Sequence, residues 1–104
     1  MDKSNRRIRE SPIHQGEDEQ LAYTLTIPTS WGADPSSPVV TIKDVDGEDV
    51  TSDYTSGSAS ASGAVITTPT ILDLVDKVQY RLEVRFTVSG GNVEEAWGDL
   101  RGEM

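Results

Sequence analysis

The sequence has 104 residues, a formal net charge of −9 and no cysteine. This length supports one domain with a modest core, and the lack of cysteine excludes disulfides, thiolate metal sites and thiol catalysis. The negative charge opposes binding to nucleic acid phosphates and anionic membranes, and no apolar run approaches the roughly 20 residues that span a bilayer. No export signal is visible after Met1. These properties predict a protein that binds neither nucleic acid nor a membrane.

The first 19 residues are predicted to form an extended arm, because they are polar, contain proline and glycine, and offer only Ile8 and Ile13 as apolar anchors. Four basic and two acidic residues among the first 15 give this segment a net charge of +2, so the rest of the chain carries −11. We therefore divide the chain into a basic arm, residues 1–19, and an acidic β-sandwich domain, residues 20–104.

Alternating apolar and polar residues predict two strands in the first half of the domain. Residues 20–28 alternate with period two, and Pro28 ends the strand before a loop that holds Trp31. Residues 38–45 form the second strand, and the following Asp-Gly pair predicts a tight turn into residues 48–51. The small residues of segment 55–63 favour a long loop or a weak edge strand.

The second half contains the clearest element. A short β-branched strand is predicted at residues 64–68, followed by one helical turn or a corner at residues 71–74. Strict alternation over residues 78–88 predicts the central strand of the fold. A glycine hairpin at residues 89–92 then returns the chain antiparallel over residues 93–100. Six or seven short strands with frequent turns predict an all-β fold, an antiparallel β-sandwich with a small closed barrel as the alternative.

Two groups of acidic residues raise the question of chemistry. The carboxylates of residues 44–49 suggest a calcium loop, but Thr55 stands where the last, bidentate glutamate is required, so a hairpin turn is the preferred interpretation. Glu94, Glu95 and Asp99 could supply a glycosidase pair, but neighbours on a strand point to opposite faces. We expect no enzyme activity, no metal and no cofactor.

Single histidine and tryptophan residues are the remaining candidates. His14, the only histidine, has no serine or carboxylate constrained to reach it, so a peptide contact is the preferred interpretation. Trp97 is expected in the core, whereas Trp31 is either core or an exposed contact in a Gly/Pro/Ser-rich loop. The basic arm lacks aromatic residues for stacking on bases, so an acidic protein surface, including a copy of this domain, is its expected target. The predicted partner-binding residues are Arg6, Arg7, Ile8, Arg9, Ile13 and His14 in the arm and Trp31 in the loop.

Three segments in this order resemble a known class of proteins: GEDEQLAYTLTIP, VVTIKDVDGEDVT and ITTPTILDLVDKVQYRLEVRFTVSGGNVEEAWGDLRGE. Together they cover roughly residues 15–103, and they are similar to the small immunoglobulin-like structural proteins that tailed bacteriophages and prophages encode among their virion genes. The resemblance implies an immunoglobulin-like sandwich that serves as a head decoration or tail adaptor and carries no catalytic residues.

The expected function is therefore a virion structural or accessory protein, assembled in the host bacterial cytoplasm. It would dock onto capsid or tail proteins, and onto copies of itself, through the arm and the sandwich surface. The alternative is a carbohydrate- or host-surface-binding module that uses Trp31 and segment 55–63.

Overall fold

The computed structural model describes residues 13–16 and 18–103, and these residues form an all-β domain with almost no helix. This confirms the predicted fold class. The elements are β1 (Ile13–Gly16), β2 (Thr24–Thr26), the 3₁₀ turn η2 (Thr29–Trp31), β3 (Ser36–Lys43), the helical turn α1 (Thr51–Tyr54), β4 (Thr55–Ser56), β5 (Ser60–Ser62), β6 (Val65–Thr67), β7 (Thr70–Ile71), β8 (Gln79–Thr87) and β9 (Val93–Glu103).

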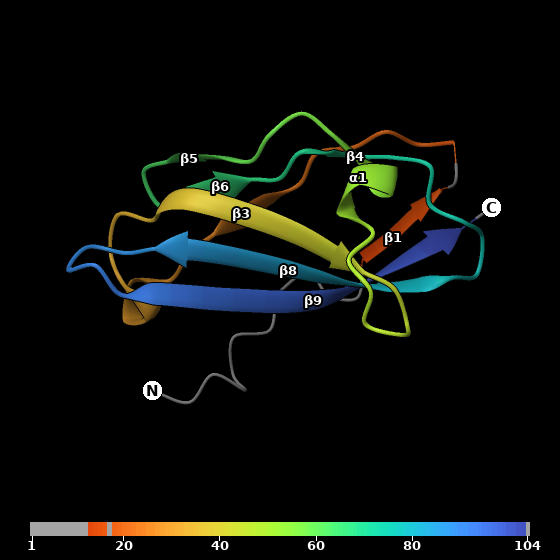
Figure 1. Ribbon diagram of the computed structural model, residues 1–104. Coiled ribbons are helices and arrows are strands. Elements are labelled where there is room, and N and C mark those ends of the chain that lie inside the picture. Colours follow the sequence, from red (N-terminus) through yellow and green to blue (C-terminus); the bar gives the residue numbers. More distant parts are fainter. Residues whose placement is uncertain (1–12, 17, 104) are drawn as a thin grey trace.

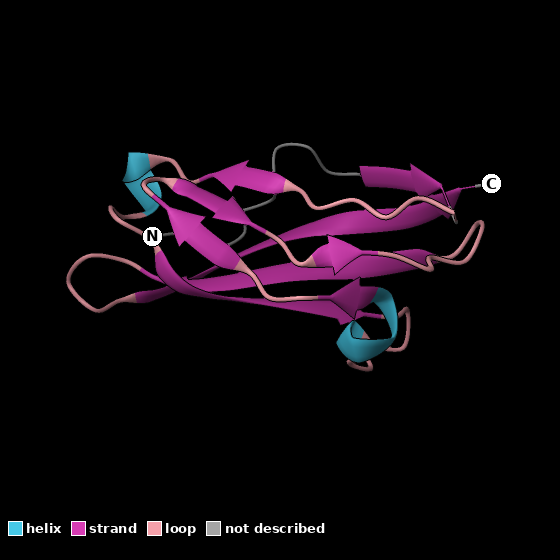
Figure 2. Ribbon diagram, turned by 90° about the horizontal axis from the view of Figure 1, so that it is seen from above, coloured by secondary structure: helices cyan, strands magenta, loops and turns pink. Residues whose placement is uncertain are grey.

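The strands form two layers. One layer is a four-stranded sheet in the order β1-β9-β8-β3, which we call the long sheet. The other layer contains a three-stranded sheet, β2-β6-β5, and a two-stranded sheet, β4-β7. Figure 1 and Figure 2 show the short strands lying together over one side of the long sheet. The arrangement is sandwich-like, and its long sheet is mixed because β1 runs parallel to β9 while the other pairs are antiparallel.

The hairpin of β8 and β9 forms the centre of the long sheet. Nine consecutive register pairs join the two strands, from Gln79 opposite Arg101 to Thr87 opposite Val93. Along β8 the buried positions alternate with exposed or half-buried ones, as the sequence pattern predicts. Gly90 and Gly91 have φ values of 98° and 89° in the connecting turn, a conformation that favours glycine. The predicted central strand and glycine hairpin are both confirmed.

The core lies between the two layers and forms one cluster. The long sheet contributes the inward side chains of its strands, and the short strands contribute a facing apolar set. The buried residues are Ile13, Leu25, Ile27, Val40, Ile42, Ile66, Ile71, Leu74, Tyr80, Leu82, Val84, Phe86, Val88, Ala96 and Leu100. More than half of them come from β8, β9 and β3, the longest strands of the domain.

The predicted boundary of the arm at residue 19 is corrected by the position of β1. Ile13–Gly16 pairs in parallel register with Leu100–Glu103, so this part of the predicted arm is a strand of the long sheet. Ile13 is 8% exposed and Gln15 is 0% exposed, because the pairing turns both side chains into the interior. The domain therefore includes residue 13, and residues 1–12 of the predicted arm lie outside the described part of the chain.

The layer of short strands differs from the prediction in its details. The segment after the Asp-Gly turn makes one bridge, between Asp49 and Lys43, and then coils into α1 instead of forming a return strand. Segment 55–63 holds β4 and β5, and the predicted strand at residues 20–28 is regular only over β2. The described chain thus has nine strands where six or seven were predicted, because bends divide this layer into short pieces.

Candidate functional site

The outward side of β3, β8 and β9 is the largest regular surface of the long sheet. Its side chains alternate along each strand with the buried core residues. We call this surface the outer face, and define it by Val39, Thr41, Lys43, Gln79, Arg81, Glu83, Arg85, Glu95, Trp97, Asp99 and Arg101. It carries both signs of charge together with one tryptophan.

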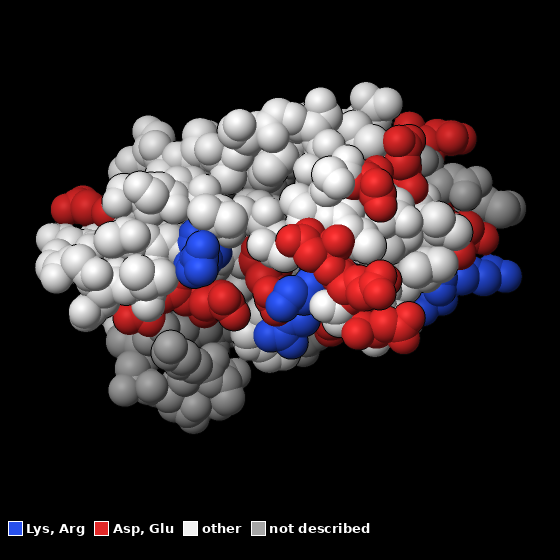
Figure 3. All heavy atoms as spheres, viewed as in Figure 1, with Lys and Arg blue, Asp and Glu red and all other residues white. Residues whose placement is uncertain are grey.

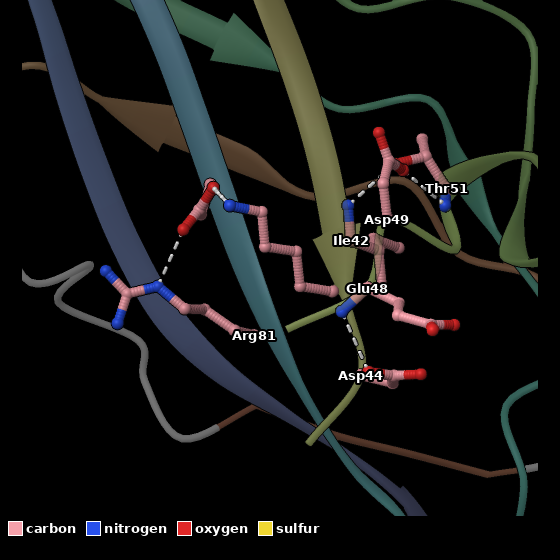
Figure 4. Close-up of polar contacts among 8 residues, drawn as sticks. Ile42, Asp44, Glu48, Asp49, Thr51 and Arg81 are labelled. Carbon is pink, nitrogen blue, oxygen red and sulfur yellow. Dashed lines mark hydrogen bonds and ion pairs between the residues drawn. The ribbon is translucent and has the colours of Figure 1, made fainter. Parts of the chain in front are cut away.

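A charged cluster occupies the centre of the outer face. The Glu83 carboxylate accepts hydrogen bonds from both sides: its Oε1 lies 3.1 Å from Lys43 Nζ and its Oε2 lies 2.8 Å from Arg81 Nε. The side chain of Glu83 is only 15% exposed, so the two cations cover it. Figure 4 shows Arg81 in this contact, beside the end of β3. Two ion pairs therefore link Lys43 on β3 with Arg81 and Glu83 on β8.

Trp97 extends this cluster. The Arg81 guanidinium lies 4.8 Å from the centre of the Trp97 ring, a distance at which a cation is attracted by the face of the indole. Trp97 is half-buried on the outer face, which corrects its expected place in the core. Side chains alternate between the two sides of a strand, and Ala96 and Gly98, the neighbours of Trp97, occupy inward positions of β9. Trp97 therefore points outward. Sequence reasoning placed a tryptophan by its size, whereas strand alternation decided its face.

A second pair of charges lies one row further along the strands. Arg85 on β8 stands directly opposite Glu95 on β9, and both side chains are exposed. Within residues 13–16 and 18–103 no ion pair joins them. An open hollow of about 300 Å³ lies beside them and is also lined by Val39 and Thr41. The outer face is thus ordered at its centre and open at this end.

The acidic turn between β3 and α1 uses its carboxylates to hold its own backbone. Asp44 Oδ1 accepts a hydrogen bond from the N–H of Asp46 at 2.9 Å. It also accepts one from the N–H of Glu48 at 3.0 Å, which Figure 4 shows. Asp49 Oδ1 accepts from the Thr51 hydroxyl at 2.6 Å and its N–H at 3.0 Å, and these bonds hold the pKa of Asp49 below its usual value. These contacts fit the predicted turn. Among the described residues no group of three or more His, Asp or Glu is placed to hold a metal ion.

The last part of the predicted arm, which contains β1, is bonded to both layers of the domain; we call it the root of the arm. Gln15 Nε2 donates to the carbonyl oxygens of Ile71 at 2.7 Å and Glu19 at 2.9 Å, and Gln15 Oε1 accepts from the Tyr23 hydroxyl at 2.6 Å. Burial, with a smaller effect from the charge of Glu19, raises the pKa of the Tyr23 hydroxyl. The Gln15 side chain is fully buried and its donors and acceptor are all used. Sequence reasoning missed this residue because it assigned it to the arm.

The other predicted arm residues divide into two groups. Ile13 is taken up by the core, and His14 Nδ1 lies 2.7 Å from Glu103 Oε1 on the exposed side of the sheet. Arg101 Nε approaches the same carboxylate at 3.6 Å. Arg6, Arg7, Ile8 and Arg9 lie outside the described residues. The structure thus brings His14 to the end of the long sheet, where it contacts the chain's last strand.

Trp31 lies in η2, away from the outer face. It is half-buried and packs against the core cluster, while its N–H donates to the Pro28 carbonyl at 2.9 Å. The next residue, Gly32, has a φ of 129° and lies so close to Val88 that a Cβ atom there would come within 2.6 Å of that side chain. The turn is therefore packed down onto the domain.

The residues of the outer face could be partly foreseen from sequence. Alternation over residues 78–88 places Arg81, Glu83 and Arg85 together on one side of a strand. Their partners Lys43 and Glu95 depend on the register of β3 and β9, which no local pattern specifies. Glu94 lies on the opposite side of β9 from Glu95 and Asp99, because it is the register partner of the buried Phe86.

No protein-family model matches the chain, and no curated protein is significantly similar to it. The resemblance to phage structural proteins therefore rests on the sequence pattern alone. No helix in the described part of the chain is long and apolar enough to cross a membrane.

Proposed function

We propose that the chain is a non-enzymatic structural or adaptor protein of a tailed phage virion, built on an immunoglobulin-like sandwich. In this proposal residues 1–12 fasten the domain to a capsid or tail lattice, and the domain acts as a rigid spacer. The sequence resemblance supports the location, and the all-β domain is compatible with it. Repetition on a symmetric lattice multiplies weak contacts, so each copy needs only modest affinity.

The observation that carries the proposal is the anchoring of the arm's root by Gln15. A tail that fastens a domain to a lattice transmits force to the first ordered residues of that domain. Here those residues are the strand β1, which pairs with β9 through four register pairs. The Gln15 side chain of β1 also donates a hydrogen bond to the carbonyl of Ile71 in the facing layer. A pull on residues 1–12 would therefore be spread over both layers instead of peeling off an edge strand.

The charge distribution supports an acidic partner for the arm. Residues 1–12 contain all four of the basic residues that precede β1, whereas the domain is strongly acidic. Figure 3 shows acidic side chains gathered around the turn after β3 and the adjoining end of the molecule, while much of the layer of short strands carries no charge. Opposite charges on arm and target would raise the rate of docking and select the partner.

Deletion of residues 2–12 tests the proposal. We expect the shortened protein to keep its circular dichroism spectrum and to unfold cooperatively, because the described domain begins at Ile13. Supplied in place of the full chain in a host that produces the phage, it should fail to sediment with particles on a density gradient. Incorporation equal to that of the full chain would contradict the anchoring role.

The matched control reverses charge without shortening the arm. A variant with Arg6, Arg7 and Arg9 replaced by glutamate keeps the length of the chain, so its loss from particles would assign docking to charge. If this variant sediments with particles and the deletion does not, contacts other than these charges fasten the arm.

A further inference from the structure

The layer of short strands carries no charge. The chain has 9 basic and 18 acidic residues, yet none of them falls within residues 20–33 or 54–72. These two segments contain β2, β4, β5, β6 and β7, so every strand of this layer is built from uncharged residues. Figure 3 shows the layer largely free of acidic and basic side chains. A second copy of this acidic chain can therefore approach the layer without meeting like charge there.

The strand β2 forms one edge of this layer. Its sheet has the order β2-β6-β5, so among the described residues β2 has a paired strand on one side only. The N–H of Ile27 donates to the Ala64 carbonyl at 2.7 Å, so the backbone groups of Ile27, and of Leu25 two residues before it, are directed toward β6. Because the direction alternates along a strand, the N–H and C=O groups of Thr24 and Thr26 point away from β6.

The exposed edge of β2 has the properties of a site where another strand can add. Edge strands are usually protected by charged side chains, proline or a covering segment. Ala22, Thr24 and Thr26 are instead exposed, uncharged and able to donate from their N–H groups. Leu21, which is 39% exposed, lies on the same side of the chain as the buried Leu25. This edge thus offers main-chain hydrogen bonds together with apolar surface.

We propose that β2 pairs edge to edge with β2 of a second copy of this chain, in an antiparallel contact with two-fold symmetry. The axis would pass beside Thr24, perpendicular to the sheet, so that Thr24 of each copy faces Thr24 of the other. Ala22 would then face Thr26 of the second copy, and Thr26 would face its Ala22. Each facing pair exchanges two main-chain hydrogen bonds, about six in all. The two sheets would join in the order β5-β6-β2-β2-β6-β5.

The chain on either side of β2 selects this register. A shift of the second copy in one direction would set Ala22 opposite Pro28, whose nitrogen cannot donate a hydrogen bond. A shift in the other direction would bring in Gln20, which lies outside any strand and next to the turn in which the Glu19 N–H bonds back to Gly16. The register centred on Thr24 avoids both, and every facing residue in it can donate and accept.

The side chains between these positions would also find partners. In the register centred on Thr24, Tyr23 would lie beside Leu25 of the second copy and Leu21 beside its Ile27. Aromatic and aliphatic side chains on neighbouring strands stabilise a sheet when they lie opposite each other. The exposed surface of Leu21 would be partly covered in this contact. The edge is therefore self-complementary, as an isologous interface requires.

The charge of the chain sets how this contact responds to salt. Two copies with a net charge of −9 each repel at long range, although the joined edges are uncharged. Added salt screens this repulsion, so association should strengthen between about 20 and 200 mM salt. A short strand pair buries less than the roughly 1,200 Å² of stable interfaces, so we expect a weak monomer–dimer equilibrium.

The main test changes the position that faces itself. Thr24→Lys and Thr24→Glu each place like charges opposite each other across the axis, so each should weaken self-association by about threefold or more. An equimolar mixture of the two variants should associate at least as well as the unaltered chain, because lysine then faces glutamate. Analytical ultracentrifugation of the purified full chain over a concentration series measures these effects. Recovery in the mixture requires contact between copies at this position.

Two controls separate edge pairing from other effects. Ser60→Lys adds the same charge on β5, at the far edge of the same sheet, and should leave association within about twofold. Thr24→Pro removes the donor at the centre of the contact, and proline is tolerated on an edge strand where the N–H faces solvent. It should weaken association by about tenfold or more, whereas Thr24→Val keeps the donor and should have little effect.

A chain that stays monomeric up to about 1 mM would overturn the proposal and leave this edge to a strand of another protein. A mixture of Thr24→Lys and Thr24→Glu that associates no better than the separate variants would also overturn it. So would a dimer that a folded Thr24→Pro variant leaves intact; if circular dichroism shows that this variant is unfolded, the lysine and glutamate variants decide. These measurements need only purified protein, so this inference and the virion proposal can fail independently.

Discussion

Gln15 is a fully buried amide with its two hydrogen-bond donors on the Ile71 and Glu19 carbonyls and its acceptor on the Tyr23 hydroxyl. A buried polar group is tolerated only when its bonds are made, and removing one partner leaves the others without water to replace it. This single side chain joins the edge strand β1 to the facing layer. Its contribution to stability is therefore expected to exceed that of an ordinary surface residue on the same strand.

The first prediction follows from that environment. Gln15→Ala should lower the free energy of unfolding by about 2–4 kcal/mol, because it leaves buried groups unpaired and opens a cavity. Urea denaturation followed by tryptophan fluorescence measures the change. Gln20→Ala, at an exposed position outside any strand, is the control and should cost less than about 0.5 kcal/mol. Equal effects at the two positions would show that the Gln15 bonds are not important for stability.

Tyr54 gives a prediction for alkaline pH. A hydrogen bond with the Tyr80 side chain, together with burial, raises the pKa of Tyr54 from 10.0 to about 12. The two rings are tilted against each other at a centroid distance of 4.9 Å. Because the folded state holds the proton more tightly than the unfolded state, this stabilisation is complete below pH 10 and is lost as pH rises to about 12.

The measurement is urea denaturation of the unaltered chain and of Tyr54→Phe at pH 9 and at pH 11. The unaltered chain should lose stability over this range, and the variant should lose less, since it has one fewer tyrosine whose pKa depends on folding. The raised pKa of Tyr23 acts in the same direction in both proteins and does not affect the difference. Parallel losses in the two proteins would contradict the coupling between Tyr54 and folding.

At the scale of elements, the end of β9 is held between two neighbours. Gly102 is the register partner of Gln15 on β1, and on its other side it exchanges hydrogen bonds with the segment before β8. Its N–H donates to the Val78 carbonyl at 3.0 Å, and its carbonyl accepts from the Lys77 N–H at 2.9 Å. A Cβ atom at this position would overlap the Val75 carbonyl oxygen and lie 2.7 Å from its carbon. The close approach of three segments therefore requires glycine here.

Gly102→Ala should accordingly destabilise the domain by about 3 kcal/mol or more, since a backbone segment must move to admit a methyl group. Gly57→Ala is a useful comparison, because its surroundings are open and only its φ of 89° is unfavourable. That change should cost about 1 kcal/mol. Thermal denaturation of the two variants separates them, and a smaller loss for Gly102→Ala than for Gly57→Ala would contradict the described packing.

The same elements show which features of this fold can be predicted from sequence. The hairpin of β8 and β9 was predicted because its signals are local: strict alternation over residues 78–88 and two glycines in the turn. Strand β1 was missed because it is short and pairs in parallel with a strand at the other end of the chain, a contact that no local pattern records. Short strands divided by bends, such as β4 and β5, carry too few residues to show alternation.

The candidate site was predictable to a similar degree. The charges on one side of β8 follow from period two, but their alignment with Glu95 and Lys43 is a property of register. Trp97 was predicted in the core because large aromatic residues are usually buried. It points outward because side chains alternate along a strand and its neighbour Ala96 points inward. Local pattern thus predicts which residues share a face, and pairing between strands decides which of them meet.

At the scale of the whole molecule, charge is distributed unevenly between the start of the chain and the domain. The basic residues that precede β1 are joined to a strongly acidic domain, and β1 ties that junction into the core. The outer face adds a surface with both signs of charge. These features are compatible with the proposal that residues 1–12 fasten the domain to a partner.

The most direct test of the central claim is quantitative mass spectrometry of particles purified from a host that carries the gene, with peptide amounts of this chain compared with those of the major capsid protein. The account predicts that this chain is present in particles at a fixed ratio, unchanged by further purification and set by the symmetry of the head or tail. Its absence from purified particles, or a ratio that falls with each purification step, would contradict the claim that it is a virion component.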